Sequence, residues 1–125
     1  AAERTLRVLV ADDHPANRRI VELMLAEAAE VTCVENGLEA VRAYLVERPD
    51  VVLMDMQMPV MDGLSAVSEI RRLEVAGGQE RRPIFMLTAN AGDEHVRASL
   101  AAGADRHLQK PITAASLFGA LQAVL

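Results

Sequence analysis

The chain is poor in cysteine, in aromatic residues and in long apolar runs, and each shortage excludes a class of protein. The single cysteine, Cys33, excludes an internal disulfide and a CxxC metal site. Aromatic residues make up 2% of the chain and tryptophan is absent, so platforms that stack nucleic acid bases are not expected. No apolar stretch reaches the length of a membrane span, and no basic segment followed by an apolar one opens the chain. We therefore expect neither membrane contact nor a signal peptide.

Acidic residues outnumber basic ones, 18 to 13, which gives a formal net charge of −5. A net-negative domain is poorly suited to direct binding of nucleic acid through bulk charge. The cysteine content fits a reducing compartment, and we expect a cytoplasmic protein. A length of 125 residues is typical of one domain, so we treat residues 1–125 as a single folding unit.

Short apolar runs alternate with longer segments of helical period. The runs cover residues 8–11, 31–34, 51–54 and 84–87, with a weak one at 106–109. Runs that are apolar at every position suit strands of a parallel sheet with helices on both faces. The intervening segments predict helices, with apolar stripes and end signals at defined positions. The stripes are Ile20, Leu23 and Met24 in the first helix and Leu38, Val41 and Leu45 in the second, and Asp93 is the expected N-cap of the fourth.

This order predicts an α/β fold, a flavodoxin-like (βα)5 doubly wound sandwich with a parallel five-stranded sheet in the order 2-1-3-4-5. Ligands of such sheets bind at the carboxyl ends of the strands. The polar residues that directly follow the first, third, fourth and fifth of these runs are Asp12, Asp13, Asp55, Thr88 and Lys110.

The three carboxylates should lie close together at this edge of the sheet, where they would repel one another. A hard divalent cation removes this conflict, and Mg²⁺ prefers oxygen ligands of this kind. Taken singly, an Asp pair is an ordinary turn, and Thr88 or Lys110 is an ordinary surface residue. Taken together, the five residues indicate phosphoryl transfer, with one of the carboxylates as the nucleophile and with Thr88 and Lys110 stabilising the phosphoryl oxygens.

These residues, with Asp55-Met-Gln-Met-Pro-Val-Met-Asp-Gly63 and Lys110-Pro111, resemble the response-regulator receiver domains of two-component signalling. The resemblance implies that Asp55 is the phosphoacceptor. It also implies Mg²⁺ held by Asp13, Asp55 and the backbone carbonyl of Gln57, and by Asp12 through water. A histidine kinase or a histidine phosphotransfer domain would be the phosphodonor, docking beside the first helix at residues 16–28. The segments 13–17 and 35–40 are similar to receivers of hybrid histidine kinases, so a parent chain could carry kinase activity.

The resemblance also implies a conformational switch and a surface that it changes. Thr88 would move toward the phosphoryl group, and an aromatic residue of the last strand would turn inward. His107 stands at that aromatic position, so Thr88 and His107 form the candidate switch. The changed face, made by the fourth helix, the last strand and the last helix, is a possible dimer interface.

Two neutral amides, Gln57 and Asn90, follow Asp55 and Thr88 by two residues and are candidates for tuning dephosphorylation by controlling attacking water. We expect autophosphorylation and autodephosphorylation but no independent turnover enzyme. Three alternatives stay open, namely a flavodoxin-like small-ligand domain, a phosphatase of the haloacid dehalogenase type and an unphosphorylated scaffold. Asp12 and Asp13 disfavour the first by repelling a bound phosphate, and Gln57 disfavours the second by replacing the acid it needs. A P-loop nucleotide hydrolase is excluded because GxxxxGK[ST] is absent.

Overall fold

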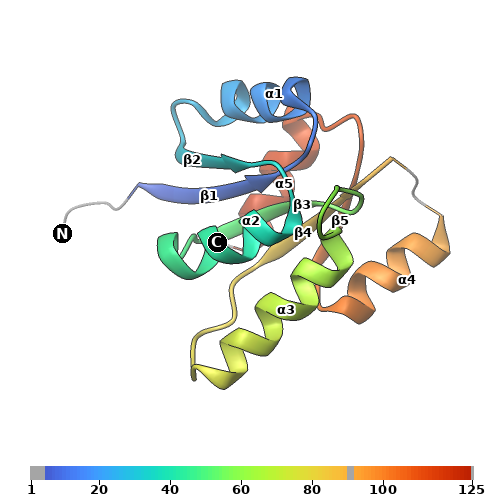
Figure 1. The fold of residues 1–125 in the computed structure, drawn as a ribbon. Coiled ribbons are helices and arrows are strands. Elements are labelled where there is room, and N and C mark those ends of the chain that lie inside the picture. The colour runs from blue at the N-terminus through green and yellow to red at the C-terminus, as the bar shows by residue number, and fades with distance from the viewer. Residues whose placement is uncertain (1–4, 90–91, 125) are drawn as a thin grey trace.

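The computed structural model describes residues 5–89 and 92–124. Strands and helices alternate along the chain, as the apolar runs predicted (Figure 1). In chain order they are β1 (Leu6–Ala11), α1 (Pro15–Leu25), β2 (Ala29–Val34), α2 (Gly37–Glu47), β3 (Val51–Asp55), α3 (Gly63–Ala76), β4 (Ile84–Thr88), α4 (Asp93–Ala102), β5 (Arg106–Gln109) and α5 (Ala114–Val124).

The strands form one parallel sheet in the order β2-β1-β3-β4-β5, which confirms the predicted topology. The chain runs from β1 outward to β2 and then returns across β1 to β3. The strand order therefore reverses between β1 and β3, and a crevice opens at their carboxyl ends in sheets of this kind. This topology places the functional residues expected from the sequence at one edge.

Two apolar cores lie on opposite faces of the sheet, because side chains alternate between faces along each strand. Leu9, Met54 and Met86 belong to the core on the side of α2 and α3. Val10 and Leu53 belong to the core on the side of α1 and α5. Figure 1 shows α1 and α5 covering one face of the sheet and α2, α3 and α4 covering the other. Burial on both faces explains the apolar runs of β1, β3 and β4, whereas the edge strands β2 and β5 are more polar and less buried.

Three helices begin with a side chain that caps the free amides of the first turn. Asn36 and Asp62 each accept a hydrogen bond of 2.8 Å from the amide three residues further on. Thr113 does the same through its hydroxyl oxygen at 3.1 Å. The prediction that Asp93 caps α4 is wrong, because Asp93 is the first helical residue and the N-cap is Gly92, which has no side chain to accept a bond. Asp93 instead contributes negative charge to the first turn, which favours the helix dipole.

The predicted apolar stripe of α1 is wrong at Ile20 and Leu23, although its third member, Met24, packs against the core. Val21 and Leu25 are the buried residues of this helix, whereas Ile20 is 45% exposed and Leu23 is 60% exposed. The segment carries more apolar residues than one face holds, so two stripes were compatible with a helical period. Leu45 of α2 is likewise 43% exposed, because Tyr44 occupies the buried position beside it. The helix α1 therefore presents an apolar surface to solvent.

An ionic cluster, buried at Tyr44 and Glu74 and exposed at Asp105, joins α2, α3 and the segment before β5. Arg71 donates to Glu74 at 2.8 Å, to Asp105 at 2.7 Å and to the Gly103 carbonyl at 2.9 Å. The Tyr44 hydroxyl also donates to Glu74. Burial opposes the ionisation of Glu74, but the hydrogen bonds that it accepts outweigh burial and lower its pKa. Burial, with the bond to Glu74, raises the pKa of Tyr44. We call these five residues the Arg71 cluster.

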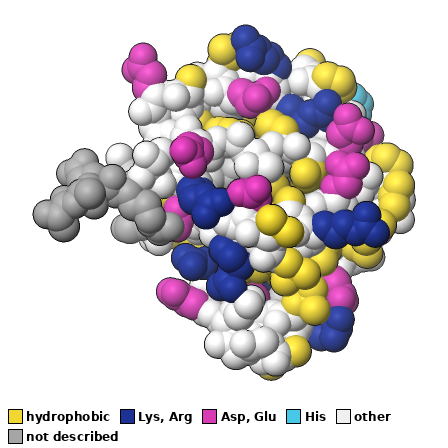
Figure 2. All heavy atoms as spheres, turned by 60° about the vertical axis from the view of Figure 1, so that its left-hand side comes forward, with side chains coloured by type: hydrophobic (Ala, Val, Ile, Leu, Met, Phe, Trp, Pro, Cys, Tyr) yellow, Lys and Arg dark blue, Asp and Glu magenta, His cyan; other side chains and the backbone are white. Residues whose placement is uncertain are grey.

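Charged side chains of both signs are interspersed over the face shown in Figure 2. Such mixing limits the extent of any one-sign electrostatic field on this face. Among residues 5–89 and 92–124, no helix combines the length and the apolar character needed to cross a bilayer.

Candidate functional site

The carboxyl edge of the sheet brings together the polar residues singled out from the sequence. Asp12 follows β1, Asp55 and Thr88 end β3 and β4, and Lys110 follows β5. Asp55 is paired with Leu87 in the parallel register, so the ends of β3 and β4 lie side by side. Asp12, Asp55 and Thr88 are nearly completely buried, with exposures of 5% or less. Burial of charged groups at this density requires partners of opposite charge.

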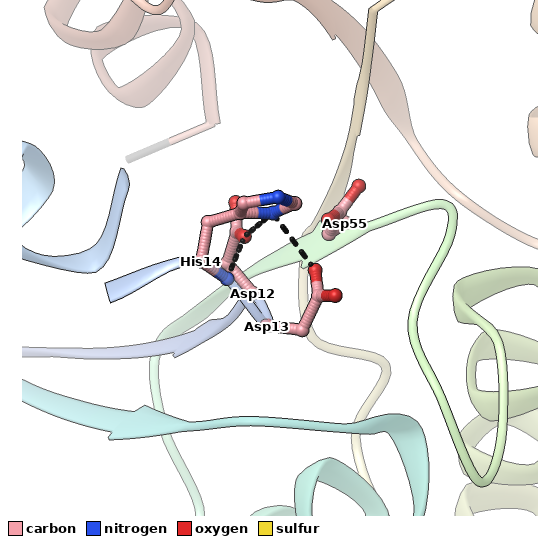
Figure 3. A group of neighbouring side chains, drawn as sticks. All are labelled: Asp12, Asp13, His14 and Asp55. Atoms are coloured by element: carbon pink, nitrogen blue, oxygen red, sulfur yellow. Dashed lines mark hydrogen bonds and ion pairs between the residues drawn. The ribbon is translucent and has the colours of Figure 1, made fainter. Parts of the chain in front are cut away.

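Four side chains form a compact group of potential metal ligands (Figure 3). One ligand atom from each of Asp12, Asp13, His14 and Asp55 lies within 4.8 Å of the others. The His14 Nδ1 atom is 3.1 Å from Asp13 Oδ1 and 3.6 Å from Asp12 Oδ1. Its backbone amide donates to Asp12 Oδ1 at 2.9 Å. The three carboxylates fit the oxygen-rich coordination of Mg²⁺, and His14 lies at the exposed rim of this group.

Lys110 provides the cation nearest to two of these acids. Its ammonium nitrogen is 3.1 Å from Asp12 Oδ2 and 3.1 Å from Asp55 Oδ2. The peptide bond to Pro111 is cis. Burial acts to lower the pKa of Lys110, but the carboxylates of Asp55 and Asp12 outweigh burial and raise it. Lys110 is therefore held in its charged form at this edge.

One lysine does not balance the acids around it. Burial, and then the charge of Asp12, raise the pKa of Asp55 in spite of the contact with Lys110. The charged form of Asp55 is thus disfavoured relative to a solvated aspartate. A bound divalent cation would stabilise that charged form. The donor set, with Asp12 and Asp55 buried and acidic, fits such an ion.

A cavity of about 200 Å³ opens beside Asp55. It is lined by His14, Asp55, Met56, Gln57, Thr88, Ala89, His95 and Lys110. The sequence-based predictions missed His95, which contacts the Met56 sulfur through Nδ1 at 3.3 Å. His95 belongs to α4, and its approach depends on how this helix packs, which no motif in the sequence signals.

Of the two amides proposed to tune dephosphorylation, Gln57 and Asn90, the structure describes Gln57. Gln57 is exposed, lines the cavity, and its backbone amide is 3.4 Å from Asp55 Oδ1. Asn90 lies outside the described residues. Thr88 lines the same cavity, and its hydroxyl is hydrogen-bonded to His107 Nε2 on β5. The structure therefore brings the candidate switch residues into direct contact.

The loop between β3 and α3 approaches the site so closely that a glycine is required. A Cβ atom on Gly63 would lie 2.1 Å from the carbonyl oxygen of Asp55. The Gly63 amide donates to the Met56 carbonyl at 2.8 Å and closes the loop onto the strand end. Within this loop, Val60 has a φ of 70°, a left-handed conformation that a β-branched residue rarely adopts. The Asp55–Gly63 motif thus encodes a tight turn that carries Gln57 next to Asp55.

The family model described as the response regulator receiver domain matches residues 8–122. The chain belongs to the response regulator receiver family. Receiver domains are phosphoacceptor modules of two-component signalling, which is the function that the sequence motifs predicted.

The sensor protein GacS of Pseudomonas syringae pv. syringae is 45% identical over 113 residues, which cover 90% of this chain and 12% of that protein. The receiver domain described here thus spans about an eighth of the length of that relative. GacS is a sensor protein, which supports the predicted similarity to receivers of hybrid histidine kinases.

Two solved receiver domains share the fold. The receiver of the sensor histidine kinase PA1611 from Pseudomonas aeruginosa PAO1 has a TM-score of 0.84 and 38% identity, and the match covers 97% of this chain and 98% of that one. It was crystallised with a magnesium ion coordinated in its active site cleft. The receiver of Saccharomyces cerevisiae Ssk1, solved in complex with the phosphotransfer protein Ypd1, has a TM-score of 0.92 and 26% identity, covering 96% of this chain and 88% of that chain.

Proposed function

We propose that this receiver domain accepts a phosphoryl group on Asp55 from a phosphohistidine. The single observation that carries the proposal is the contact of Asp55 with both a cavity and a cation: Asp55 lines the 200 Å³ cavity, and Lys110 lies 3.1 Å from its Oδ2 atom. In the reaction a carboxylate oxygen of Asp55 forms a bond to phosphorus while the bond between phosphorus and the donor imidazole nitrogen breaks. The imidazole leaves with the electron pair of that bond.

Mg²⁺ would be held by Asp13, by Asp55 and by the backbone carbonyl of Gln57, with Asp12 acting through water. When bound, the ion supplies charge neutralisation at the transferring oxygens. Lys110 binds a phosphoryl oxygen as a second cation, and the Thr88 hydroxyl donates a hydrogen bond to another. The burial of Asp12 and Asp55 supports this assignment, as does the magnesium ion in the related PA1611 receiver.

Loss of the phosphoryl group by attack of water is the second reaction that we assign to the site. Gln57 borders the cavity from which water reaches Asp55, and its neutral amide would orient or exclude that water. Asn90 is proposed for the same role on the basis of its position in the sequence. The domain acts once per phosphoryl group, so we assign no independent turnover to it.

The phosphodonor would dock on α1. Ile20 and Leu23 are exposed there, and a hollow of about 50 Å³ extends from Ile20 to Lys110, Pro111 and Ile112. An apolar patch beside the acceptor fits a helical partner that delivers a phosphohistidine. The complex of the Ssk1 receiver with Ypd1 supports a histidine phosphotransfer domain or a histidine kinase as that partner.

The output surface would be the face of α4, β5 and α5. Leu100 of α4 is 50% exposed, which leaves an apolar side chain for a target or for a second copy of the domain. Kinase activity elsewhere in a longer parent chain is proposed from the similarity to the sensor protein GacS.

Incubation with acetyl phosphate and Mg²⁺, followed by intact mass measurement, tests the acceptor assignment. We expect one labile phosphoryl adduct that maps to Asp55 and that is absent from Asp55→Asn. Asp62→Asn is the matched control, because Asp62 is an exposed aspartate of the same loop and asparagine caps a helix equally well. An adduct that persists in Asp55→Asn, or that disappears in Asp62→Asn, would contradict the proposal.

A further inference from the structure

His14 is a histidine at the rim of the acidic group, and the proposed function leaves it without a role. Its Nδ1 atom is 3.1 Å from Asp13 Oδ1 and 3.6 Å from Asp12 Oδ1, and Figure 3 shows its ring turned toward the carboxylates. Together with Asp55, these residues each place one potential ligand atom within 4.8 Å of the others. A nitrogen ligand therefore lies beside three oxygen ligands.

The separations within this group fit the ligands of one metal ion. Nitrogen and oxygen ligands lie about 2.1 Å from a transition metal ion, so adjacent ligands are roughly 3 Å apart and opposite ones roughly 4.2 Å apart. The distance of 3.1 Å from His14 Nδ1 to Asp13 Oδ1 is that of adjacent ligands. Asp13 Oδ1 is also buried and accepts no hydrogen bond from the described part of the chain. This oxygen atom is therefore available to a cation.

The backbone fixes the position of His14 before any ion binds. A residue that precedes proline is restricted to extended conformations, and His14 precedes Pro15 with φ −96° and ψ 117°. Its amide also donates to Asp12 Oδ1 at 2.9 Å. Although His14 is the N-cap of α1, its side chain makes no capping hydrogen bond. The imidazole can therefore bind an ion without giving up a bond that stabilises the helix.

We propose that His14 is a ligand of this metal site through Nδ1 and that it gives the site affinity for Zn²⁺ in addition to Mg²⁺. This inference rests on the proposed function, because it adds a ligand to the metal site described there. Imidazole nitrogen suits Zn²⁺, whereas carboxylate, carbonyl and water oxygens suit Mg²⁺. With Zn²⁺, the lone pair of Nδ1 takes the place of one water ligand, and the ring hydrogen stays on Nε2. With Mg²⁺, which releases water reluctantly, His14 stays outside the ligand set.

The first experiment compares the affinities for Zn²⁺ and for Mg²⁺ by titration calorimetry. Loss of a group that only supports a metal ligand lowers metal affinity about 10- to 100-fold, so loss of a direct ligand in His14→Phe should weaken Zn²⁺ binding roughly tenfold or more. The affinity for Mg²⁺ should change little. The side chain of His14 is 69% exposed, so this substitution leaves the core intact. Unchanged Zn²⁺ affinity, or equal losses for the two ions, would overturn the proposal.

His95→Phe is the matched control. His95 lines the same cavity as His14, but its Nδ1 atom contacts the Met56 sulfur and it is not a member of the group of ligand atoms. The same substitution there should leave Zn²⁺ affinity nearly unchanged. A loss as large as that in His14→Phe would contradict the assignment of His14 as the ligand.

Competition between the two ions tests whether they share one site. Added Mg²⁺ should weaken the apparent binding of Zn²⁺ to the wild-type domain, because both ions need the same carboxylates. Zn²⁺ binding that ignores Mg²⁺ would place Zn²⁺ elsewhere on the surface and would overturn the proposal.

The second experiment observes the bond itself by nitrogen NMR of the imidazole rings. The chain has three histidines, and the His14→Phe variant identifies the signals of His14. Zn²⁺ should move the Nδ1 signal of His14 to the range of a metal-bound nitrogen and leave Nε2 protonated, whereas Mg²⁺ should not. Bound Zn²⁺ without this shift, or with the shift on another histidine, would contradict the assigned ligand.

A separate measurement distinguishes this inference from the function on which it rests. Beryllofluoride mimics the phosphoryl group on an aspartate, and its Mg²⁺-dependent binding tests the acceptor site without Zn²⁺. A domain that binds beryllofluoride with Mg²⁺, but whose Zn²⁺ affinity does not depend on His14, would overturn the inference alone. A domain that binds neither Mg²⁺ nor beryllofluoride would overturn the proposed function and this inference with it.

Discussion

Replacing Lys110 by methionine should change the affinities for Mg²⁺ and for beryllofluoride in opposite directions. The ammonium group of Lys110 lies 3.1 Å from a carboxylate oxygen of Asp12 and 3.1 Å from one of Asp55. Hydrogen bonds to charged groups each contribute about 1.5–3 kcal/mol, and a divalent cation bound by the same carboxylates competes with them. The side chain of Lys110 is 20% exposed, so water replaces part of these bonds and the lower end of the range applies.

If Mg²⁺ displaces one of these two bonds, the expected gain in its affinity is about 1.5 kcal/mol, or roughly tenfold. Beryllofluoride instead loses a direct cationic partner of about 1.5–3 kcal/mol, which corresponds to a loss of roughly ten- to a hundredfold. Titration calorimetry measures the affinity for Mg²⁺, and fluorine NMR of the bound mimic measures the affinity for beryllofluoride. Because the sequence contains a single lysine, nitrogen labelling of lysine also gives one side-chain signal that reports both events.

Arg19→Met is the matched control, because it removes the same charge from an exposed position of α1 and should leave both affinities nearly unchanged. Weaker binding of Mg²⁺ to Lys110→Met would show that the lysine organises the acids more than it competes for them. That result would refute the electrostatic reasoning applied to this site. Unchanged beryllofluoride binding would remove Lys110 from the phosphoryl-binding group.

Three further predictions concern stability. Arg71→Met should lower the free energy of unfolding, measured by urea denaturation, by about 3–5 kcal/mol, because it leaves buried Glu74 without its cation. Arg72→Met breaks an exposed ion pair and should not measurably shift the urea midpoint. The pKa of Glu74 is lowered in the folded protein, so ionised Glu74 stabilises the fold above about pH 4.5, and this stabilisation is lost as the pH falls further. In Glu74→Gln, the free energy of unfolding should therefore depend less steeply on pH in the acid range. Val60→Asn should raise stability by about 1 kcal/mol by relieving a left-handed φ, and Val46→Asn, in a helix, should not.

The location of the site was largely predictable because the order of the parallel strands places its residues at neighbouring strand ends. The strands β3 and β4 are short apolar runs that end in Asp55 and Thr88, Asp12 directly follows the apolar β1, and parallel strands end at the same edge of the sheet. Asp12, Asp55, Thr88 and Lys110 are therefore brought together by the strand order alone. Their side-chain contacts follow from sharing one small, buried volume.

The residues that escaped prediction are those whose environment depends on helix packing. Arg71 and Glu74 are three residues apart on α3, and so are Glu69 and Arg72. The first pair is buried, with side chains 12% and 4% exposed, while Arg72 in the second is 64% exposed. Spacing is the same in both pairs, so only the direction in which the helix faces its neighbours separates them. The exposed Ile20 was misplaced for the same reason.

The charge balance of the site explains why these components occur together. Asp12, Asp13 and Asp55 contribute a formal charge of −3 and Lys110 contributes +1, which leaves −2. A phosphoryl group, itself carrying about −1.5 to −2, would be repelled by this uncompensated site. A bound divalent cation would bring the formal charge to zero, and the cavity beside Asp55 would then favour an anion. Lys110 alone is too little positive charge to permit phosphorylation, and the cation alone leaves the far side of the phosphoryl group without a partner. The acids, the ion and the lysine therefore have to act as one unit, which is why removal of Lys110 should separate metal affinity from phosphoryl affinity.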